Sequence, residues 1–340
     1  MVGVRRAAPP PPHVLAGTAC RLPPHVLADA APASEPRRTA IAGTRAGNQV
    51  IMQACLIVSW PAAMLLGTTP GPEGAHVFDA VAVIDDLREE SGELDRLVGG
   101  LSAERWAVPT PAEGWTVAHQ IAHLSWTDDV ALVAATEPDR FADEVAKALE
   151  RPDSFVDEAA GELVAAHGPD ALLARWRAGR QRLQGVLRAA PAGSRFPWYG
   201  PPMGVASMAT ARIMETWAHG QDIADALGVT RTPTARLRHV ARIGVRARDY
   251  AYAVRGIKPP ESEFRVELTS PEGELIAYGP EGAPQCIAGP LLDFCLLVTQ
   301  RAHRDDLAVT ATGHDADQWL NIAQAFAGPA GTGRSPRKGH

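Results

Sequence analysis

Hydrophobic residues recur at steps of three and four positions through the middle of the chain, which is the spacing of amphipathic helices. The pattern predicts a first helix over residues 77–101 and a second that Thr116 caps and that continues to about residue 133. A third helix is expected over residues 172–187, where leucines and a tryptophan share one stripe. Each of these helices has one apolar face to bury.

Two further helices are predicted before the pattern changes. One spans residues 205–227 and ends at Gly228, a residue type favoured after the last turn of a helix. The next begins with Thr232 as cap and Pro233 in the first turn, and its apolar positions continue to residue 254. Four or five such helices in sequence are typical of an up-and-down bundle.

From residue 258 the hydrophobic period changes to two. Phe264, Val266 and Leu268 alternate with charged residues, and the turn 270–273 leads to a returning strand over 275–278. The remaining expected elements are a helix over 290–300, a strand over 307–311 and a helix over 315–326. The fold class is therefore mainly α, a helical bundle followed by a small α+β domain.

These patterns divide the chain into four segments. Residues 1–75 form an N-terminal extension, 76–257 the helical bundle, 258–328 the α+β domain and 329–340 a tail.

The N-terminal extension has the composition of a disordered segment. Residues 1–75 hold eleven of the 29 prolines and contain the hexapeptide PPHVLA twice, so they cannot bury enough apolar surface to fold. Their apolar run 50–66 is interrupted by polar residues and by Pro61, and we expect neither a membrane span nor an export signal there. Alternatively, the start is mis-assigned and the chain begins near Met52 or Met64.

Charge and cysteine usage narrow the class of protein. The formal net charge is -6, and the arginine-rich extension leaves the rest of the chain more acidic still. Nucleic-acid binding is not expected, because phosphate contacts need clustered Lys and Arg. Cys286 and Cys295 lie in or beside an apolar segment without C-x-x-C spacing, which favours buried thiols and a cytoplasmic location.

One helix carries three ionisable groups on a single face. Glu215, His219 and Asp222 are spaced by four and three residues, and the same face carries apolar residues. Ionisable groups that point into a bundle are costly unless they are paired or bind a ligand. A surface ion pair is the other interpretation of Glu-x-x-x-His, and the motif alone leaves both open.

An earlier helix supplies two more histidines, His119 and His123, spaced by one helical turn. Two imidazoles and a carboxylate on neighbouring helices are a common set of zinc ligands, and three protein ligands leave a fourth position open. Only one of these two histidines is needed to complete such a set.

Together the motifs resemble those of the DinB-like metalloproteins, in particular the mycothiol-dependent maleylpyruvate isomerase branch of actinobacteria. Residues 114–124 look like that branch's first ligand motif, in which the metal histidine precedes the closing leucine, and this implies His123. Glu215 and His219 match the second motif, and the resemblance extends over about 77–227. It implies a DinB-like bundle that holds a divalent metal, zinc, with these three residues.

The chain also departs from the isomerase. His119 stands where relatives often carry an acidic residue, and the aromatic, proline-rich loop 196–203 has no assigned counterpart. Residues 289–301 are similar to a segment that carries a wyosine-base-formation label. The acidic charge and the lack of a radical-SAM cysteine triad speak against that label as a function.

The resemblance implies an isomerase or thiol transferase that acts on a small molecule through a low-molecular-weight thiol such as mycothiol. Asp222 is expected either to orient His219 or to be a plain surface carboxylate. Arg301 is expected to bind a substrate carboxylate at the mouth of the metal cavity, together with Trp198, or to be a helix-end cation. The alternatives are a non-catalytic metal-binding or stress-response module and a factor associated with tRNA wyosine modification.

Overall fold

The computed structural model describes residues 79–337 except residue 153. The predicted extension 1–75 and the last three residues of the predicted tail lie outside the described residues.

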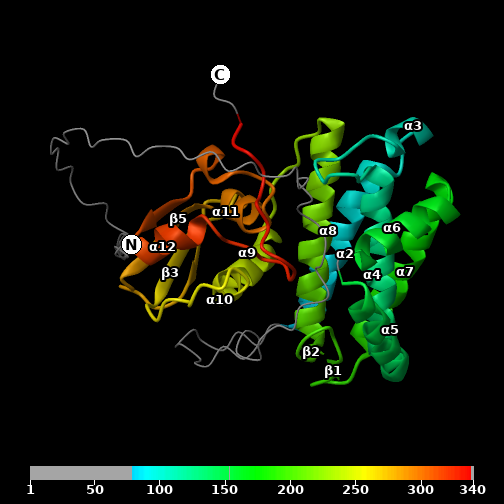
Figure 1. Ribbon diagram of the computed structural model, residues 1–340, viewed down its shortest axis with the longest axis horizontal. Helices are drawn as coiled ribbons and strands as arrows, with labels where there is room; N and C mark the ends of the chain where they lie inside the picture. The colour runs from blue at the N-terminus through cyan, green and yellow to red at the C-terminus, as the bar shows by residue number, and fades with distance from the viewer. Residues whose placement is uncertain (1–78, 153, 338–340) are drawn as a thin grey trace, which may run out of the picture. The chain divides into compact units, whose positions relative to one another are not determined.

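Four long helices build the bundle: α2 (Ala80–Val98), α4 (Val117–Thr136), α7 (Pro169–Ala189) and α8 (Val205–Leu227). Helix α4 packs against α7 and α8, and α2 packs against the same two helices, so the four close into a ring (Figure 1). Helix α8 has the predicted limits and ends at Gly228, whose φ of 67° requires glycine's freedom. The prediction of a mainly α protein with a helical bundle is confirmed.

Smaller elements were not predicted. They are α3 (Ala103–Trp106), α5 (Pro138–Glu150), α6 (Phe155–Ala166) and the strands β1 (Arg195–Phe196) and β2 (Met203–Gly204). Helices α5 and α6 pack on α4, and β1 pairs with β2 immediately before α8. Among the described residues α5 buries only Phe141 and Ala148, although Phe141, Val145 and Ala148 recur at helical spacing and could have predicted it.

The C-terminal part contains a four-stranded sheet in the order β4-β3-β5-β6. Its strands are β3 (Phe264–Thr269), β4 (Leu275–Tyr278), β5 (Gln285–Pro290) and β6 (Thr310–Thr312). The predicted β3–β4 hairpin is confirmed, with Gly273 N–H bonded to Ser270 C=O in its turn. Strand β5 was not predicted, although it lies inside the sheet and runs parallel to β3.

Four helices accompany this sheet: α9 (Leu237–Arg246), α10 (Arg248–Ala253), α11 (Leu291–Val298) and α12 (His314–Leu320). The predicted helix start at Thr232 is wrong, because α9 begins five residues later and a break separates it from α10. Helix α9 approaches α11 so closely that a Cβ at Gly244 would lie 2.7 Å from Val298 Cγ2. Helices α9 and α10 therefore share a core with the sheet, and the boundary at residue 257 stays a prediction.

Helix α8 contributes to both hydrophobic cores. Ile213 and Met208 pack with α2 and α7, whereas Met214 and Trp217 join the core that contains the sheet (Figure 1). A helix that is covered in this way carries buried residues around its whole circumference.

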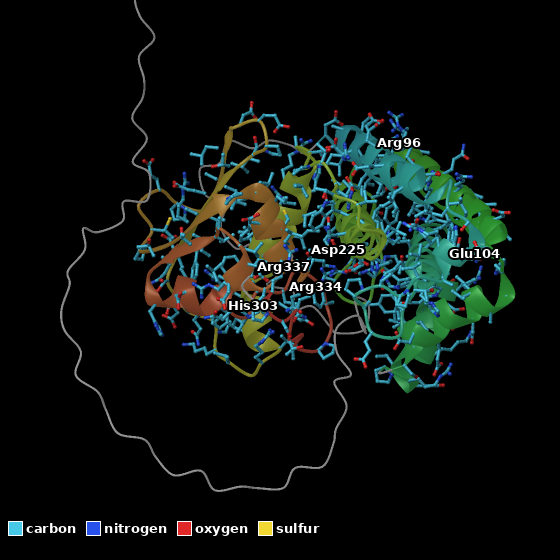
Figure 2. All side chains as sticks on the ribbon, turned by 90° about the horizontal axis from the view of Figure 1, so that it is seen from above. Arg96, Glu104, Asp225, His303, Arg334 and Arg337 are labelled. Atoms are coloured by element: carbon cyan, nitrogen blue, oxygen red, sulfur yellow. The ribbon has the colours of Figure 1, made fainter. Side chains whose placement is uncertain are left out.

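The segment that follows α12 is held by side chains of earlier elements. The Tyr250 hydroxyl donates to Gly328 C=O at 2.7 Å, and Arg334 pairs with Asp222. Arg334 also pairs with Asp225 (Figure 2). The described part of the predicted tail is thus attached to α8 and α10.

Two further expectations concern thiols and membranes. Cys295 is a free, buried thiol as predicted, and Cys286 is buried as well. Within residues 79–337, no helix is long and apolar enough to cross a bilayer.

Glu90 of α2 is the centre of a buried ion-pair network. Its carboxylate accepts from Arg231 at 2.5 Å and from Arg236 at 2.8 Å, and Glu93 accepts from the same two guanidiniums. The Glu90 side chain is 2% exposed. The network joins α2 to the segment between α8 and α9.

We predict that Glu90→Ala lowers the free energy of unfolding by about 3 kcal/mol, because two arginines lose a buried partner. Urea titration measures this change. The matched control is Glu89→Ala, since Glu89 is exposed and pairs with Arg88 at the surface. Equal stability of the two variants would contradict the structural role of Glu90.

Candidate metal centre

His123, Glu215 and His219 form a buried cluster between α4 and α8. One donor atom from each lies within 4.8 Å of the other two. Glu215 Oε2 lies 3.3 Å from His123 Nε2 and 3.3 Å from His219 Nε2. The three side chains implied by the resemblance therefore meet in the bundle core, and Glu215 lies between the two imidazoles.

His119 has a different place, at the start of α4. Its Nδ1 lies 2.9 Å from the hydroxyl of Thr116 and accepts the Thr116 backbone N–H at 3.3 Å, so the pair forms a capping box. His119 thus helps to cap the N-terminus of α4 and is not part of the three-residue cluster.

Gln120 orients His219, which is the role that one of the two predictions gives to Asp222. Gln120 Oε1 lies 2.5 Å from His219 Nδ1, and its amide donates to the Thr110 hydroxyl at 2.9 Å. Since an amide oxygen can only accept, His219 carries its proton on Nδ1, and its Nε2 presents a lone pair to Glu215. The sequence signal for Gln120 was its position three residues before His123, which places it on the same face of α4.

The electrostatics of this cluster favour a bound cation. Burial and the neighbouring His123 lower the pKa of His219 to about 4, against the influence of Glu215. Burial opposes ionisation of Glu215, but its contacts with the imidazoles of His123 and His219 hold its pKa well below the usual range. At neutral pH an imidazole lone pair thus faces a carboxylate at 3.3 Å, an arrangement that a positive ion between them would stabilise. The donor set fits a divalent metal.

Two tryptophans shield the histidines. The ring of Trp115 lies 5.4 Å from that of His123 and 6.0 Å from that of His219, and Trp126 lies 5.9 Å from His123. The indole N–H of Trp115 donates to Asp157 at 2.9 Å, which fixes the ring. This aromatic wall excludes water from one side of the cluster.

Asp222 and Arg301 bind each other. Arg301 Nη2 donates to Asp222 Oδ2 at 2.9 Å, Nη1 donates to Thr299 C=O at 2.6 Å, and Arg334 donates to the second Asp222 oxygen at 2.7 Å. Arg301 is buried and does not line the cavity that reaches Glu215. Its charge acts on the cluster at longer range, as the least of the influences that lower the pKa of His219.

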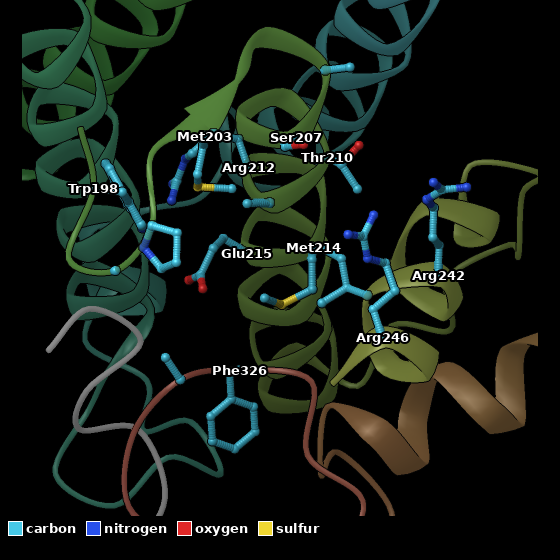
Figure 3. A pocket seen from close by; sticks show the side chains of 16 residues that line it. Trp198, Met203, Ser207, Thr210, Arg212, Met214, Glu215, Arg242, Arg246 and Phe326 are labelled. Atoms are coloured by element: carbon cyan, nitrogen blue, oxygen red, sulfur yellow. The ribbon is translucent and has the colours of Figure 1, made fainter. Parts of the chain in front are cut away.

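A cavity of about 170 Å³ reaches the cluster through Glu215 (Figure 3). Its walls come from the loop that carries Trp198, from one face of α8, from α9 and from residues 326–327. Trp198 stacks on Phe141 of α5, with ring centroids 5.8 Å apart, which holds the loop in place. The cavity gives a small molecule access to Glu215 while the two histidines stay behind it.

The bundle and its buried His–Glu–His cluster define a DinB-like helical protein. The family model described as the mycothiol maleylpyruvate isomerase N-terminal domain matches residues 87–224. Two Mycobacterium tuberculosis proteins, Uncharacterized protein MT0041 and Uncharacterized protein Rv0036c, are each 56% identical over 251 residues, which covers 74% of this chain and 97% of theirs. The chain belongs to this actinobacterial family with a mycothiol maleylpyruvate isomerase N-terminal domain, and the resemblance inferred from the sequence is confirmed.

Two crystal structures of the mycothiol-dependent maleylpyruvate isomerase, one of them of a mutant, are 18% identical to this chain. The match covers 69% of this chain and 94% of theirs, with a TM-score of 0.45.

We predict that His123→Ala, Glu215→Ala and His219→Ala each reduce bound metal from about one ion per chain to nearly none, because two protein donors remain. Elemental analysis of the purified variants measures this occupancy. His119→Ala is the control and should keep its metal, since His119 caps α4. Loss of metal in His119→Ala with full occupancy in His123→Ala would overturn the ligand assignment.

Gln120→Leu should weaken metal binding roughly 10- to 100-fold, because His219 loses the partner that sets its tautomer and ring orientation. Competition with a chromophoric chelator measures the affinity. Gln120→Glu is the conservative variant, since it keeps an acceptor for His219 Nδ1–H. An unchanged affinity in Gln120→Leu would show that packing alone orients His219.

Proposed function

We propose that the protein is a metal-dependent enzyme that uses a low-molecular-weight thiol, such as mycothiol, to isomerise a small electrophilic molecule or to transfer the thiol to it. The observation that carries the proposal is the junction of the His123–Glu215–His219 cluster with a cavity through Glu215. A buried donor set that meets a cavity at one ligand leaves room for an exchangeable ligand. The family model adds mycothiol as the thiol to test and isomerisation as the reaction.

Zinc is the metal that we propose. Two histidine nitrogens and one carboxylate oxygen are a ligand set of catalytic zinc sites, which keep a fourth position open. When bound, the ion would supply a positive charge that keeps a coordinated thiol deprotonated at neutral pH. Thiolate sulfur is a nucleophile, whereas the protonated thiol is not.

The residues of the chain supply the remaining requirements. His219 is neutral at pH 7 and its Nδ1 proton is held by Gln120, so the Nε2 lone pair is directed at the site. Glu215 is ionised and reaches the cavity, where it adds negative charge to the donor set. Trp115 and Trp126 keep water from the far side, which strengthens electrostatic interactions inside the site.

The cavity also favours an enzyme over the non-catalytic metal-binding module. A module that only stores or structurally uses a metal needs a closed donor set. Here the carboxylate donor lines a cavity with apolar and basic walls, which is typical of a small-molecule site.

We predict that mycothiol adds a thiolate-to-metal charge-transfer band to the near-ultraviolet spectrum of the cobalt-substituted protein, because its sulfur occupies the open position. S-methylated mycothiol is the matched control and should produce no such band. Maleylpyruvate turnover that depends on both metal and thiol would support the isomerase. A cobalt spectrum that no thiol changes, without turnover, would leave a non-catalytic module.

A further inference from the structure

The cavity has a second polar end, opposite the candidate metal centre. Arg242 and Arg246 of α9 both line it, one helical turn apart, and Ser207 and Thr210 of α8 line it as well. Neither arginine belongs to the motifs that resemble the isomerase branch. This end therefore offers guanidinium and hydroxyl donors to a ligand that the cavity admits.

Apolar side chains separate the two polar ends. In Figure 3, Met214 lies between Glu215 on one side and Arg246 on the other, and Phe326 lies below them. Ile243, between the two arginines in sequence, also lines the cavity. A molecule that fills the cavity would thus contact a polar group, an apolar surface and then positive charge.

Arginine supplies most of the charged side chains along the wall. Arg212 also lines the cavity, and its Nε donates to Asp128 at 2.9 Å and its Nη2 to the Thr127 hydroxyl at 2.6 Å. Among the described lining residues, Glu215 is the acidic one, and it belongs to the metal donor set.

The two α9 arginines also influence each other. Desolvation lowers the pKa of Arg246, and the positive charge of Arg242 lowers it further. An anion bound beside both guanidiniums would be stabilised by the same charges, and guanidinium is well suited to carboxylate.

We infer that Arg242 and Arg246 form an anion-recognition subsite, and that the cavity selects elongated substrates. Such a molecule has its reactive group near Glu215, an apolar segment over Met214 and a carboxylate at α9. The inference rests on the proposed function for the identity of the reacting end, whereas the arginine end can be tested without metal. The two arginines would then determine which small molecules the enzyme accepts.

Thiols that carry a carboxylate at the far end test both ends of the cavity at once. Mercaptohexanoate and mercaptohexanol differ only in the terminal charge, and propyl and octyl homologues vary the length. We expect the zinc-loaded full chain to bind the best carboxylate at least roughly tenfold more tightly than its alcohol by calorimetry, as hydrogen bonds to a charged group imply.

Arginine variants test whether Arg242 and Arg246 cause the tighter binding of the carboxylate. Arg242→Gln and Arg246→Gln should each reduce it, the double variant should abolish it, and Arg246→Lys should retain part of it. Arg238→Gln is the matched control, because Arg238 is on the same helix but pairs with Asp86 and does not line the cavity. Melting temperatures verify that every variant is folded.

The outcomes separate this inference from the proposed function. Equal affinity for carboxylate and alcohol at every length overturns the anion subsite, while binding of both thiols supports the metal–thiol chemistry. If neither thiol binds, the proposed function fails, and metal-free protein is titrated with hexanoate and hexanol by NMR. An arginine-dependent preference for hexanoate then sustains the subsite, and equal binding overturns it.

Discussion

The burial of α8 between two hydrophobic cores is the constraint on which the rest of the structure depends. One side of the helix completes the four-helix ring, and another carries Met214, Trp217 and Ala218 into the core of the sheet. Each buried ionisable group on this helix must then find a partner inside the protein, because water cannot solvate it. The functional geometry follows from how each of these groups is satisfied.

The partners come from different elements, and each one fixes a side chain of α8. Arg212 is held by Asp128 of α4, and Asp222 is held by Arg301 beyond α11. His219 is held by Gln120 of α4. Glu215 differs, because its partners are two imidazoles, one of which directs a lone pair at it. A cation would stabilise Glu215 between these imidazoles. The requirement that buried polar groups have partners therefore also favours a metal ion at the middle of α8.

The position of α9 relates the two parts of the protein to one cavity. Close packing of Gly244 against Val298 fixes α9 on α11, and α9 also packs against α8. Arg242 and Arg246 are thereby placed on the wall of the cavity that reaches Glu215. The bundle supplies the His123–Glu215–His219 cluster and the C-terminal part supplies positive charge, so both parts of the chain build this cavity.

The sequence by itself determined the features that depend on local order. Helical periodicity and Gly228 determined the limits of α8, and spacing by four residues placed Glu215 and His219 on one of its faces. Alternation and the turn at Ser270 determined the β3–β4 hairpin. These features need no distant partner, because propensity, period and turn chemistry act within a few residues.

Only the tertiary structure decided which distant groups meet. Gln120 and His219 are 99 positions apart, and Arg301 and Asp222 are 79 apart, so no local pattern pairs them. Strand β5 is recognised by its pairing with β3 and not by an alternating pattern of its own. The cavity and its arginines likewise arise from the contact of α8 with α9. Such pairings depend on the packing of whole elements against each other, and that packing is a property of the folded chain and not of any one segment.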